Sequence, residues 1–307
     1  MPKIAIVQHG PVYYDLAASL QKAENLLKEA ASAGAELVVF GETWLSGYPA
    51  WLDHCPNMGL WDHPPTKKAF ARMYDNSLAI GSAEWEQLSS MIQQLGIYVV
   101  MGINERVLSG PGNGSLFNSL LIIGPDGSLL NHHRKLMPTY TEKLVHAQGD
   151  GHGLQSVDTH FGKLGGLICW EHWMPHARQS LHLSGEDIHV AVWPNVHEMH
   201  QVASRAYAFE GRCHVIAAGQ MLQAKELPEG METLPGIKAD DFLLRGGSCV
   251  VGPDGKYILE PVFDQSDILY ADLDLGRNQQ ERMTLDVSGH YNRPDVFSFE
   301  VKQDRLV

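Results

Sequence analysis

The chain has 307 residues, 44% of them hydrophobic and 19% charged, so it is long enough to bury a sizeable apolar core, and a disordered chain is excluded. Twenty-three Lys and Arg against 36 Asp and Glu give a formal net charge of −13, which disfavours nucleic acid as a partner because like charges repel at long range. The four cysteines have no regular short spacing, which excludes a disulfide framework and a CxxC zinc ribbon. The sequence contains no signal-peptide apolar region at its start and no run of about 20 apolar residues, so we expect no membrane span and a cytoplasmic location.

The first forty residues predict a strand, a helix and a second strand. The strands are the short apolar segments 3–7 and 37–40; Asp15 is placed to cap the helix between them and Gly34 to end it. The apolar stripe of this helix comprises Leu16, Leu20, Ala23, Leu27 and Ala30. This order predicts a parallel pair of strands with a right-handed crossover, and open α/β sheets carry their chemistry beyond the carboxyl ends of such strands. The polar and aromatic stretch 41–78 that follows predicts a functional loop with short helices.

The remainder of the chain continues the alternation of helices and strands. Gly-Pro-Asp-Gly occurs at 124–127 and again at 252–255, each time between apolar segments, and predicts two β-hairpins. The other predicted elements are a helix over 82–95 between a Ser82 cap and a Gly96 stop, strands 97–103, 164–168, 189–193, 214–218 and 268–273, and helices 175–183 and 199–211. No linker or low-complexity segment interrupts the pattern. We therefore predict one α/β domain over residues 1–307, in which residues 277–307 form a C-terminal arm used in subunit contacts.

Cys169 follows an apolar strand and precedes a helical segment that begins near Pro175. Backbone N–H groups and the positive end of a helix at such a place lower the pKa of a thiol and stabilise a developing anion. This setting predicts a nucleophile. A lone cysteine in an apolar strand is more often a packing residue, and we keep that interpretation for Cys213, Cys249 and, in the main, Cys55.

Ionisable groups also occur close to the ends of two other predicted strands. Glu42 is a candidate catalytic carboxylate, with a loop cap or an arginine partner as the alternative. Lys135 precedes an apolar-Met-Pro sequence, where a partly screened ammonium would attract negative charge; a solvated basic face is its alternative. Glu142 lies seven residues further on, and its alternative is a surface ion pair with Lys143 or Arg134.

Sixteen histidines raise the question of a metal site. The segment His197-Glu198-Met199-His200 is one residue too short for the HExxH pattern of zinc peptidases. His132 and His133 are adjacent, and adjacent side chains point to opposite faces of a strand. We therefore predict no metal site.

Taken together, three segments resemble the Glu, Lys and Cys motifs of the nitrilase superfamily of carbon–nitrogen hydrolases, and most closely its nitrilase branch. They are Gly-Glu-Thr-Trp-Leu-Ser-Gly-Tyr-Pro around Glu42, His-Arg-Lys-Leu-Met-Pro-Thr around Lys135, and Cys-Trp-Glu-His-Trp-Met-Pro from Cys169. Further similar segments extend the resemblance over nearly the whole chain; they are Glu142, the Gly149-Asp150-Gly151 turn, Trp193-Pro194, residues 204–211, Gly289-His290-Tyr291 and Arg293-Pro294-Asp295.

The resemblance implies an α-β-β-α sandwich of two packed sheets and hydrolysis of a small organic nitrile to a carboxylic acid and ammonia, with no metal or organic cofactor. It implies that Glu42 moves the proton, Cys169 attacks to form a thioimidate and then a thioester, Lys135 and the Trp170 N–H hold the developing charge, and Glu142 orients Lys135 and the water. A carboxylate that both accepts and donates needs a pKa near neutrality, which a dry pocket would produce. The family also implies a homo-oligomer, either a dimer or a larger spiral.

We predict a substrate pocket lined by aromatic side chains and by His172; the predicted residues are Tyr48, Trp51, Trp170, Trp173 and His172. His172 stands where nitrilases frequently have Asn, and His146 stands where Trp is common, so the substrate range is open. The same three catalytic residue types serve amidases and N-carbamoyl hydrolases, which are the first alternative. A non-catalytic filament or binding protein on the same fold is the second.

Overall fold

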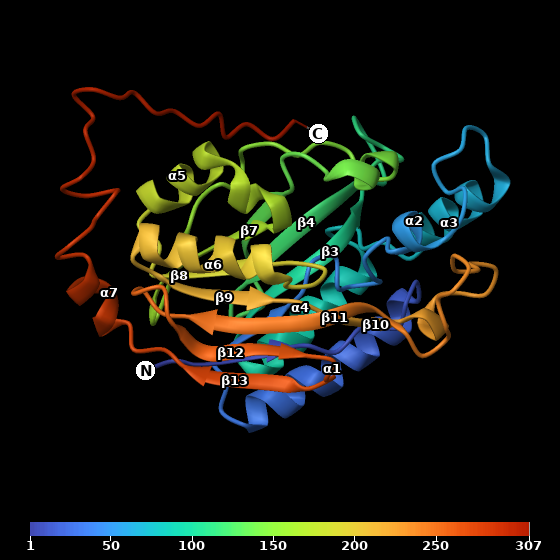
Figure 1. Cartoon of the computed structure of the whole chain (residues 1–307), viewed down its shortest axis with the longest axis horizontal. Helices are drawn as coiled ribbons and strands as arrows, with labels where there is room; N and C mark the ends of the chain where they lie inside the picture. Colours follow the sequence, from blue (N-terminus) through green and yellow to red (C-terminus); the bar gives the residue numbers. More distant parts are fainter. Residues whose placement is uncertain (307) are drawn as a thin grey trace.

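The computed structural model describes residues 1–306, and its centre is two β-sheets packed against each other with helices on both outer sides (Figure 1). The six-stranded sheet has the order β13 (Ile268–Asp272), β1 (Lys3–Val7), β2 (Leu37–Phe40), β3 (Tyr98–Arg106), β4 (Leu116–Ile123) and β5 (Leu129–Arg134). The seven-stranded sheet has the order β10 (Met221–Gln223), β11 (Phe242–Val251), β9 (His214–Ala218), β8 (Ile188–Val192), β7 (Gly162–Ile168) and β6 (Val157–Thr159), with β12 (Tyr257–Phe263) paired to β11. This is the α-β-β-α sandwich that the sequence resemblance implied, and that prediction is confirmed.

The helices form the two outer layers and the periphery. Helices α1 (Leu16–Ser32) and α4 (Ala83–Leu95) cover the six-stranded sheet, and α5 (Pro175–Leu183) and α6 (Glu198–Gly211) cover the seven-stranded sheet. The remaining helices are α2 (Trp51–His54), α3 (Pro64–Asp75), α7 (Gly276–Glu281) and the 3₁₀ helices η1 (Tyr140–Leu144), η2 (Cys169–Trp173) and η3 (Ala224–Glu226). The short helices α2 and α3 lie in the loop 41–78, as the sequence predicted.

The start of the chain folds as its residue pattern predicts. The Asp15 side chain accepts a hydrogen bond from the Ala18 N–H and caps α1, a contact that typically stabilises a helix by about 1 kcal/mol. The stripe from Leu16 to Ala30 is buried against the sheet. Strands β1 and β2 pair in parallel, with Ile4 opposite Leu37, so the crossover places the residues after β2 at the carboxyl end of the sheet.

Both predicted hairpins are present, one in each sheet. β4 and β5 pair antiparallel around residues 124–127, and β11 and β12 pair antiparallel around residues 252–255. In both turns the last glycine has a positive φ, 79° at Gly127 and 75° at Gly255. The repeated motif therefore forms equivalent turns in the two sheets. The sheets pack through a shared core that includes Leu120 and Leu167.

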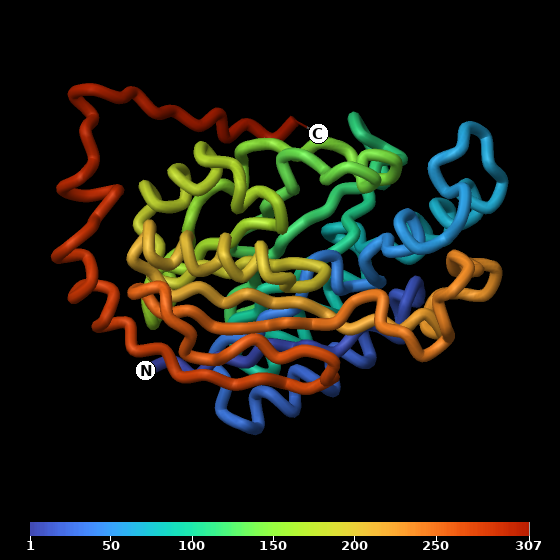
Figure 2. The backbone as a smooth tube through the Cα atoms, in the orientation of Figure 1, coloured from blue at the N-terminus to red at the C-terminus, as the bar shows by residue number. Residues whose placement is uncertain are grey.

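Two short strands, β6 and β10, have no counterpart among the predicted elements. Each has three residues and lies at an edge of its sheet, so neither is long enough to show an alternating apolar pattern. The C-terminal arm begins within α7, and its part after this helix runs along the flank and across the top of the molecule in Figures 1 and 2. Arg305 attaches its end to the body by an ion pair with Asp150 at 3.2 Å and a hydrogen bond to the His132 carbonyl at 2.7 Å.

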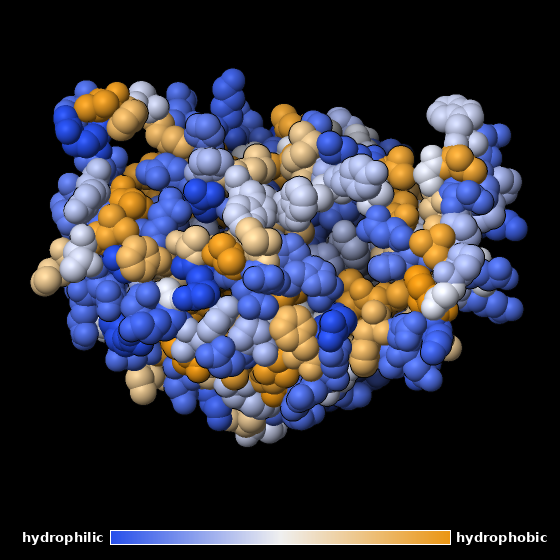
Figure 3. Space-filling model, in the orientation of Figure 1, coloured by the Kyte–Doolittle hydropathy of each residue, from blue (hydrophilic) through white to orange (hydrophobic). Residues whose placement is uncertain are grey.

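The surface in the orientation of Figure 3 is mainly polar, with apolar residues scattered among the polar ones. Within residues 1–306, the helices are all too short or too polar to cross a lipid bilayer.

Candidate active site

Residues that follow three strands meet where the two sheets face each other. Glu42 follows β2, Lys135 follows β5, and Cys169 follows β7 of the other sheet. Lys135 Nζ lies 2.7 Å from Glu42 Oε1 and 2.7 Å from Glu142 Oε2. Cys169 is near enough for the charges of these three side chains to act on its thiol. The structure therefore brings together the four residues that the sequence singled out as catalytic candidates.

Glu42 is fully buried, and only one of its two carboxylate oxygens accepts hydrogen bonds within residues 1–306. Oε1 accepts hydrogen bonds from Lys135 Nζ and, at 2.6 Å, from Asn118 Nδ2. Oε2 has no hydrogen-bond partner within residues 1–306. Burial raises the pKa of Glu42 to about 7 against the opposing charge of Lys135, and the negative charge of Glu142 adds to the rise. Glu42 is thus a carboxylate that can both accept and donate a proton near neutral pH.

Lys135 and Glu142 form a buried ion pair beside Glu42. Burial by itself lowers the pKa of Lys135, but the surrounding Glu42, Cys169 and Glu142 outweigh it, and the pKa lies well above 10.5. Glu142 accepts hydrogen bonds from the Tyr48 hydroxyl at 2.9 Å, from Lys135 and from the Thr139 N–H. Burial opposes ionisation of Glu142, yet Lys135 lowers its pKa below the usual value. Lys135 is therefore a cation at neutral pH. Both residues are buried, which excludes the solvated basic face for Lys135 and the surface ion pair for Glu142.

Cys169 is buried and has a φ of 51°, a conformation that side chains other than glycine rarely adopt. Burial raises the pKa of its thiol well above the usual value, Glu42 raises it further, and Lys135 opposes the rise. The prediction of a lowered thiol pKa at a helix start is therefore wrong. The physical reason is that the five-residue 3₁₀ helix η2 separates Cys169 from α5, while buried carboxylates surround the sulfur.

A third buried carboxylate, Glu171, connects the chain next to Cys169 with the chain next to Lys135. Glu171 accepts hydrogen bonds from the Ile168 N–H at 2.7 Å and from the Leu136 N–H at 2.8 Å. His133 Nε2 lies 2.8 Å from the same carboxylate. Glu171 therefore ties the start of η2 to the segment that carries Lys135, which keeps the thiol and the ammonium in register.

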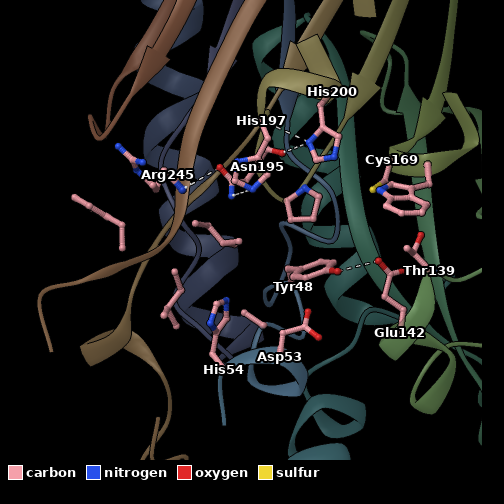
Figure 4. Close-up of a pocket in the computed structure, with 16 residues that line it drawn as sticks. Tyr48, Asp53, His54, Thr139, Glu142, Cys169, Asn195, His197, His200 and Arg245 are labelled. Carbon is pink, nitrogen blue, oxygen red and sulfur yellow. Dashed lines mark hydrogen bonds between the residues drawn. The ribbon is translucent and has the colours of Figure 1, made fainter. Parts of the chain in front are cut away.

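Cys169 opens into a cavity of about 420 Å³ (Figure 4). Its wall near the sulfur includes Tyr48, Trp170 and Glu142. The farther wall carries polar and apolar side chains from α2, from α6 and the segment before it, and from β11; they are Asp53, His54, Asn195, His197, His200, Phe242, Leu243, Leu244 and Arg245. A site of this size and composition accommodates a small organic molecule.

Residues 3–283 match the sequence model of the carbon–nitrogen hydrolase family. The chain belongs to this family. It is 36% identical to an aliphatic nitrilase of Sinorhizobium fredii, over 98% of this chain and 96% of that protein. It is 37% identical to an arylacetonitrilase of Macrophomina phaseolina, over 96% of this chain and 89% of that protein. The crystal structure of a carbon–nitrogen hydrolase from Helicobacter pylori has the same fold, with a TM-score of 0.72 at 22% identity over 96% of each chain.

The five residues predicted to contact substrate lie in different environments of this carbon–nitrogen hydrolase. Tyr48 and Trp170 line the cavity, and Tyr48 also holds Glu142. Trp51 is fully buried in the core beneath the 41–78 loop, where its indole N–H donates to the Tyr14 hydroxyl. Trp173 is 41% exposed and is not a wall residue of the cavity. His172 is buried behind Cys169 and contacts the Cys169 carbonyl at 2.7 Å.

Several residues of the hydrolase site were not anticipated from sequence. Asn118 holds the Glu42 side chain, and Gln220 Nε2 donates to the Glu42 carbonyl at 2.6 Å. The available signal for Asn118 was an amide within the mainly apolar strand 116–123. Asn195 and Arg245 stand on the cavity wall, and Arg245 pairs with Asp264 at 2.5 Å. Among the described residues, no group of three or more His, Cys, Asp or Glu side chains is arranged to hold a metal ion.

Proposed function

We propose that this carbon–nitrogen hydrolase is a nitrilase that converts a small organic nitrile into the carboxylic acid and ammonia through covalent intermediates on Cys169. The observation that supports the proposal most strongly is that Glu42 Oε2 has no hydrogen-bond partner within residues 1–306 and lies near the protonated Cys169 thiol and the Lys135 ammonium. The similarity to nitrilases over nearly the whole chain supports it independently.

The first step is attack of the Cys169 sulfur on the nitrile carbon. Because burial keeps the thiol protonated, the nucleophile needs a base, and Glu42 with its pKa near 7 takes the proton as the S–C bond forms. The negative charge that grows on the nitrile nitrogen faces the Lys135 ammonium and the Trp170 N–H, which already points at the sulfur. Glu42 then returns the proton to nitrogen, and the product is a neutral thioimidate.

Two molecules of water complete the reaction. Glu42 removes a proton from the first water, which adds to the thioimidate carbon; the nitrogen is protonated and leaves as ammonia, and a thioester remains. The second water attacks the thioester by the same route, releases the carboxylic acid and restores the thiol. The net reaction consumes one nitrile and two waters. Glu142, kept ionised by Lys135, orients the ammonium and the attacking water.

Mass spectrometry tests this proposal directly. Protein mixed with a nitrile panel is digested, and the peptide that contains Cys169 is expected to carry an imidate or acyl adduct. The matching amides are assayed in parallel, because ammonia release from amides alone would make the enzyme an amidase. Absence of any adduct or turnover, with Cys169 no more reactive toward alkylating agents than the buried Cys213, would support a binding or filament role instead.

We also propose that the enzyme self-associates and that residues 277–307 belong to the same domain and contribute to the subunit contacts. The arm carries exposed apolar side chains, including Tyr291, Val296 and Phe297, which supports a contact role. Light scattering of the whole chain and of a chain shortened to residue 276 tests this, since a smaller assembly is expected for the shortened form. Four unpaired cysteines support a reducing compartment, and we propose the cytoplasm.

A further inference from the structure

A line of buried polar side chains begins at the backbone of Cys169 and leads away from the cavity. His172 Nδ1 lies 2.7 Å from the Cys169 carbonyl oxygen, and His172 Nε2 lies 2.9 Å from His189 Nε2. His189 Nδ1 lies 2.9 Å from Glu186 Oε2. The three side chains are between 0% and 2% exposed, so no contact in the line is shared with bulk water. The mechanism proposed above uses none of them.

The contacts in this line fix the number of protons that it holds. The Cys169 carbonyl is an acceptor, so His172 must donate from Nδ1. Neutral His172 then has a lone pair on Nε2, and His189 must donate to it from its own Nε2. At its other end, His189 meets a carboxylate and must donate from Nδ1 as well. All three contacts are hydrogen bonds only if the two rings together carry one proton more than two neutral imidazoles. Of the two rings only His189 contacts the Glu186 carboxylate, so the extra proton is assigned to His189.

If that extra proton is removed, one contact becomes repulsive. Three hydrogen-bond positions then share two protons. Two lone pairs face each other at 2.9 Å between the histidines, at 2.7 Å against the Cys169 carbonyl, or at 2.9 Å against the Glu186 carboxylate. Such a contact inside the protein is destabilising because no water replaces the lost donor.

We propose that His189 is a buried imidazolium paired with Glu186, and that its proton allows His172 to position Cys169 through the backbone carbonyl. His172, His189 and Glu186 are positioning residues, because none touches the reacting atoms. The inference rests on the proposed role of Cys169 as the nucleophile.

The surroundings of the line support this assignment. The Tyr207 hydroxyl donates to Glu186 Oε1, and the Tyr207 ring stacks on His189 with a centroid distance of 3.8 Å. The pKa of Glu186 is lowered to about 2 against the effect of burial, with His189 as the largest opposing cause, so the carboxylate is ionised. The pKa of His172 is lowered well below 6.5 by burial and by His189, so its ring is neutral. The other ionisable groups around the line are His182, His200, Arg178, Asp187, Cys213 and Arg282.

Cys169 requires such support because of its backbone. Its φ of 51° is strained for a side chain with a Cβ, and strained residues persist only where neighbours hold them on several sides. Glu171 binds the N–H of Ile168, the residue before Cys169, and His172 binds the carbonyl of Cys169 itself. The two networks together hold the thiol where Glu42 and Lys135 can act on it.

Nuclear magnetic resonance of the full chain with ¹⁵N-labelled histidine tests the extra proton. At about pH 7 both ring nitrogens of His189 are expected to have the shifts of protonated nitrogen, whereas His172 is expected to be protonated on Nδ1 alone. The variants His189→Asn and His172→Asn assign the signals. One unprotonated ring nitrogen on His189 at this pH would overturn the proposal.

The rate at which iodoacetamide alkylates Cys169 tests the positioning role without any substrate. His172→Leu removes the donor to the Cys169 carbonyl, so the rate is expected to fall on the order of tenfold, as for a buried acceptor left without its hydrogen bond. His172→Asn is expected to stay within about threefold of the wild-type rate, because an asparagine amide donates to the carbonyl without an added proton.

His182→Asn is the matched control for these variants. His182 lies 3.6 Å from the same Glu186 carboxylate but has no hydrogen bond to His172 or Cys169 among residues 1–306. We expect no change in the alkylation rate. Alkylation of the buried Cys249, which reports unfolding, is expected to stay at the wild-type level in all variants. A wild-type rate in His172→Leu, or an equal loss in His182→Asn, would overturn the positioning role.

These measurements separate the inference from the proposed function. If no nitrile is hydrolysed while the histidine signals and alkylation rates are as expected, the proposed function fails, but the protonated His189 and its positioning role are supported. If nitriles are hydrolysed and His189 is neutral, the inference alone fails.

Discussion

Replacing Asn118 by alanine is expected to move the acid limb of the pH profile to higher pH. Asn118 Nδ2 donates to Glu42 Oε1 at 2.6 Å, and this hydrogen bond stabilises the ionised carboxylate. A hydrogen bond to a charged group contributes about 1.5–3 kcal/mol, and one pH unit corresponds to about 1.4 kcal/mol, so the limb should move by about 1 to 2 pH units. Asn118 Oδ1 has no partner within the described chain, so the substitution leaves no donor unpaired there.

The sign follows from the state of Glu42 that starts the reaction. Glu42 must be ionised to take the thiol proton, so kcat/KM of the wild type rises with pH through a pKa of about 7. Asn118→Ala raises that pKa, because the ionised Glu42 carboxylate loses a hydrogen bond that stabilises it relative to the neutral carboxyl. Well below the limb, the variant should therefore be about 10- to 100-fold slower, and well above it the two enzymes should converge.

The assay is ammonia release from a hydrolysed nitrile, measured as kcat/KM between about pH 5 and pH 10, with each variant's Tm recorded. Asn131→Ala is the matched control, since Asn131 is a buried strand asparagine whose amide donates to the Gly153 and Gln155 carbonyls and has no contact with Glu42. Its profile should keep the wild-type midpoint. An unmoved midpoint in Asn118→Ala, or an equal loss of activity at every pH, would refute the electrostatic reasoning.

Three further substitutions test other parts of the structure. Lys135→Met should lower kcat by at least about 10²-fold, because it removes the ammonium that faces the developing anion; a smaller loss in single-turnover kinetics would contradict that role. Glu105→Gln should lower the free energy of unfolding in urea at neutral pH by about 3–5 kcal/mol, because it leaves the buried Arg134 guanidinium with a neutral partner. The pKa of Glu105 is lowered in the fold despite burial, so the contribution of Glu105 to the free energy of unfolding is present above the unfolded pKa of about 4.5 and disappears as the pH falls. If the difference in free energy of unfolding between Glu105→Gln and the wild type does not shrink in acid, this explanation is excluded. Gly149→Ala should lower both Tm and kcat/KM, since an added Cβ would lie 2.2 Å from the Arg134 carbonyl next to Lys135, whereas Gly59→Ala has its nearest neighbour at 3.9 Å and should be neutral in the same two measurements.

The catalytic candidates were predictable because the segments around Glu42, Lys135 and Cys169 together resemble the motifs of one family, whereas each pattern taken singly had a structural alternative. Each of these residues follows a strand whose short apolar run is visible in the sequence. Asn118 and Gln220 gave no comparable signal, because each holds Glu42 from a segment distant in sequence, 76 and 178 residues away. Only the pairing of β4 in one sheet and the packing of the second sheet against it place these amides at the carboxylate.

The amino-acid sequence by itself determined most of the elements and their order, and the resemblance of its motifs indicated the family. The Asp15 cap, the apolar stripe of α1 and the two Gly-Pro-Asp-Gly turns act over a few residues, so they can be identified without the fold. Only the tertiary structure decided that Trp51 lies in the core, that His172 lies behind the thiol, and that the thiol's pKa is raised. The physical reason is that hydrogen bonds within a helix or turn connect neighbours in the chain, whereas desolvation and the field of buried charges come from strands far apart in sequence.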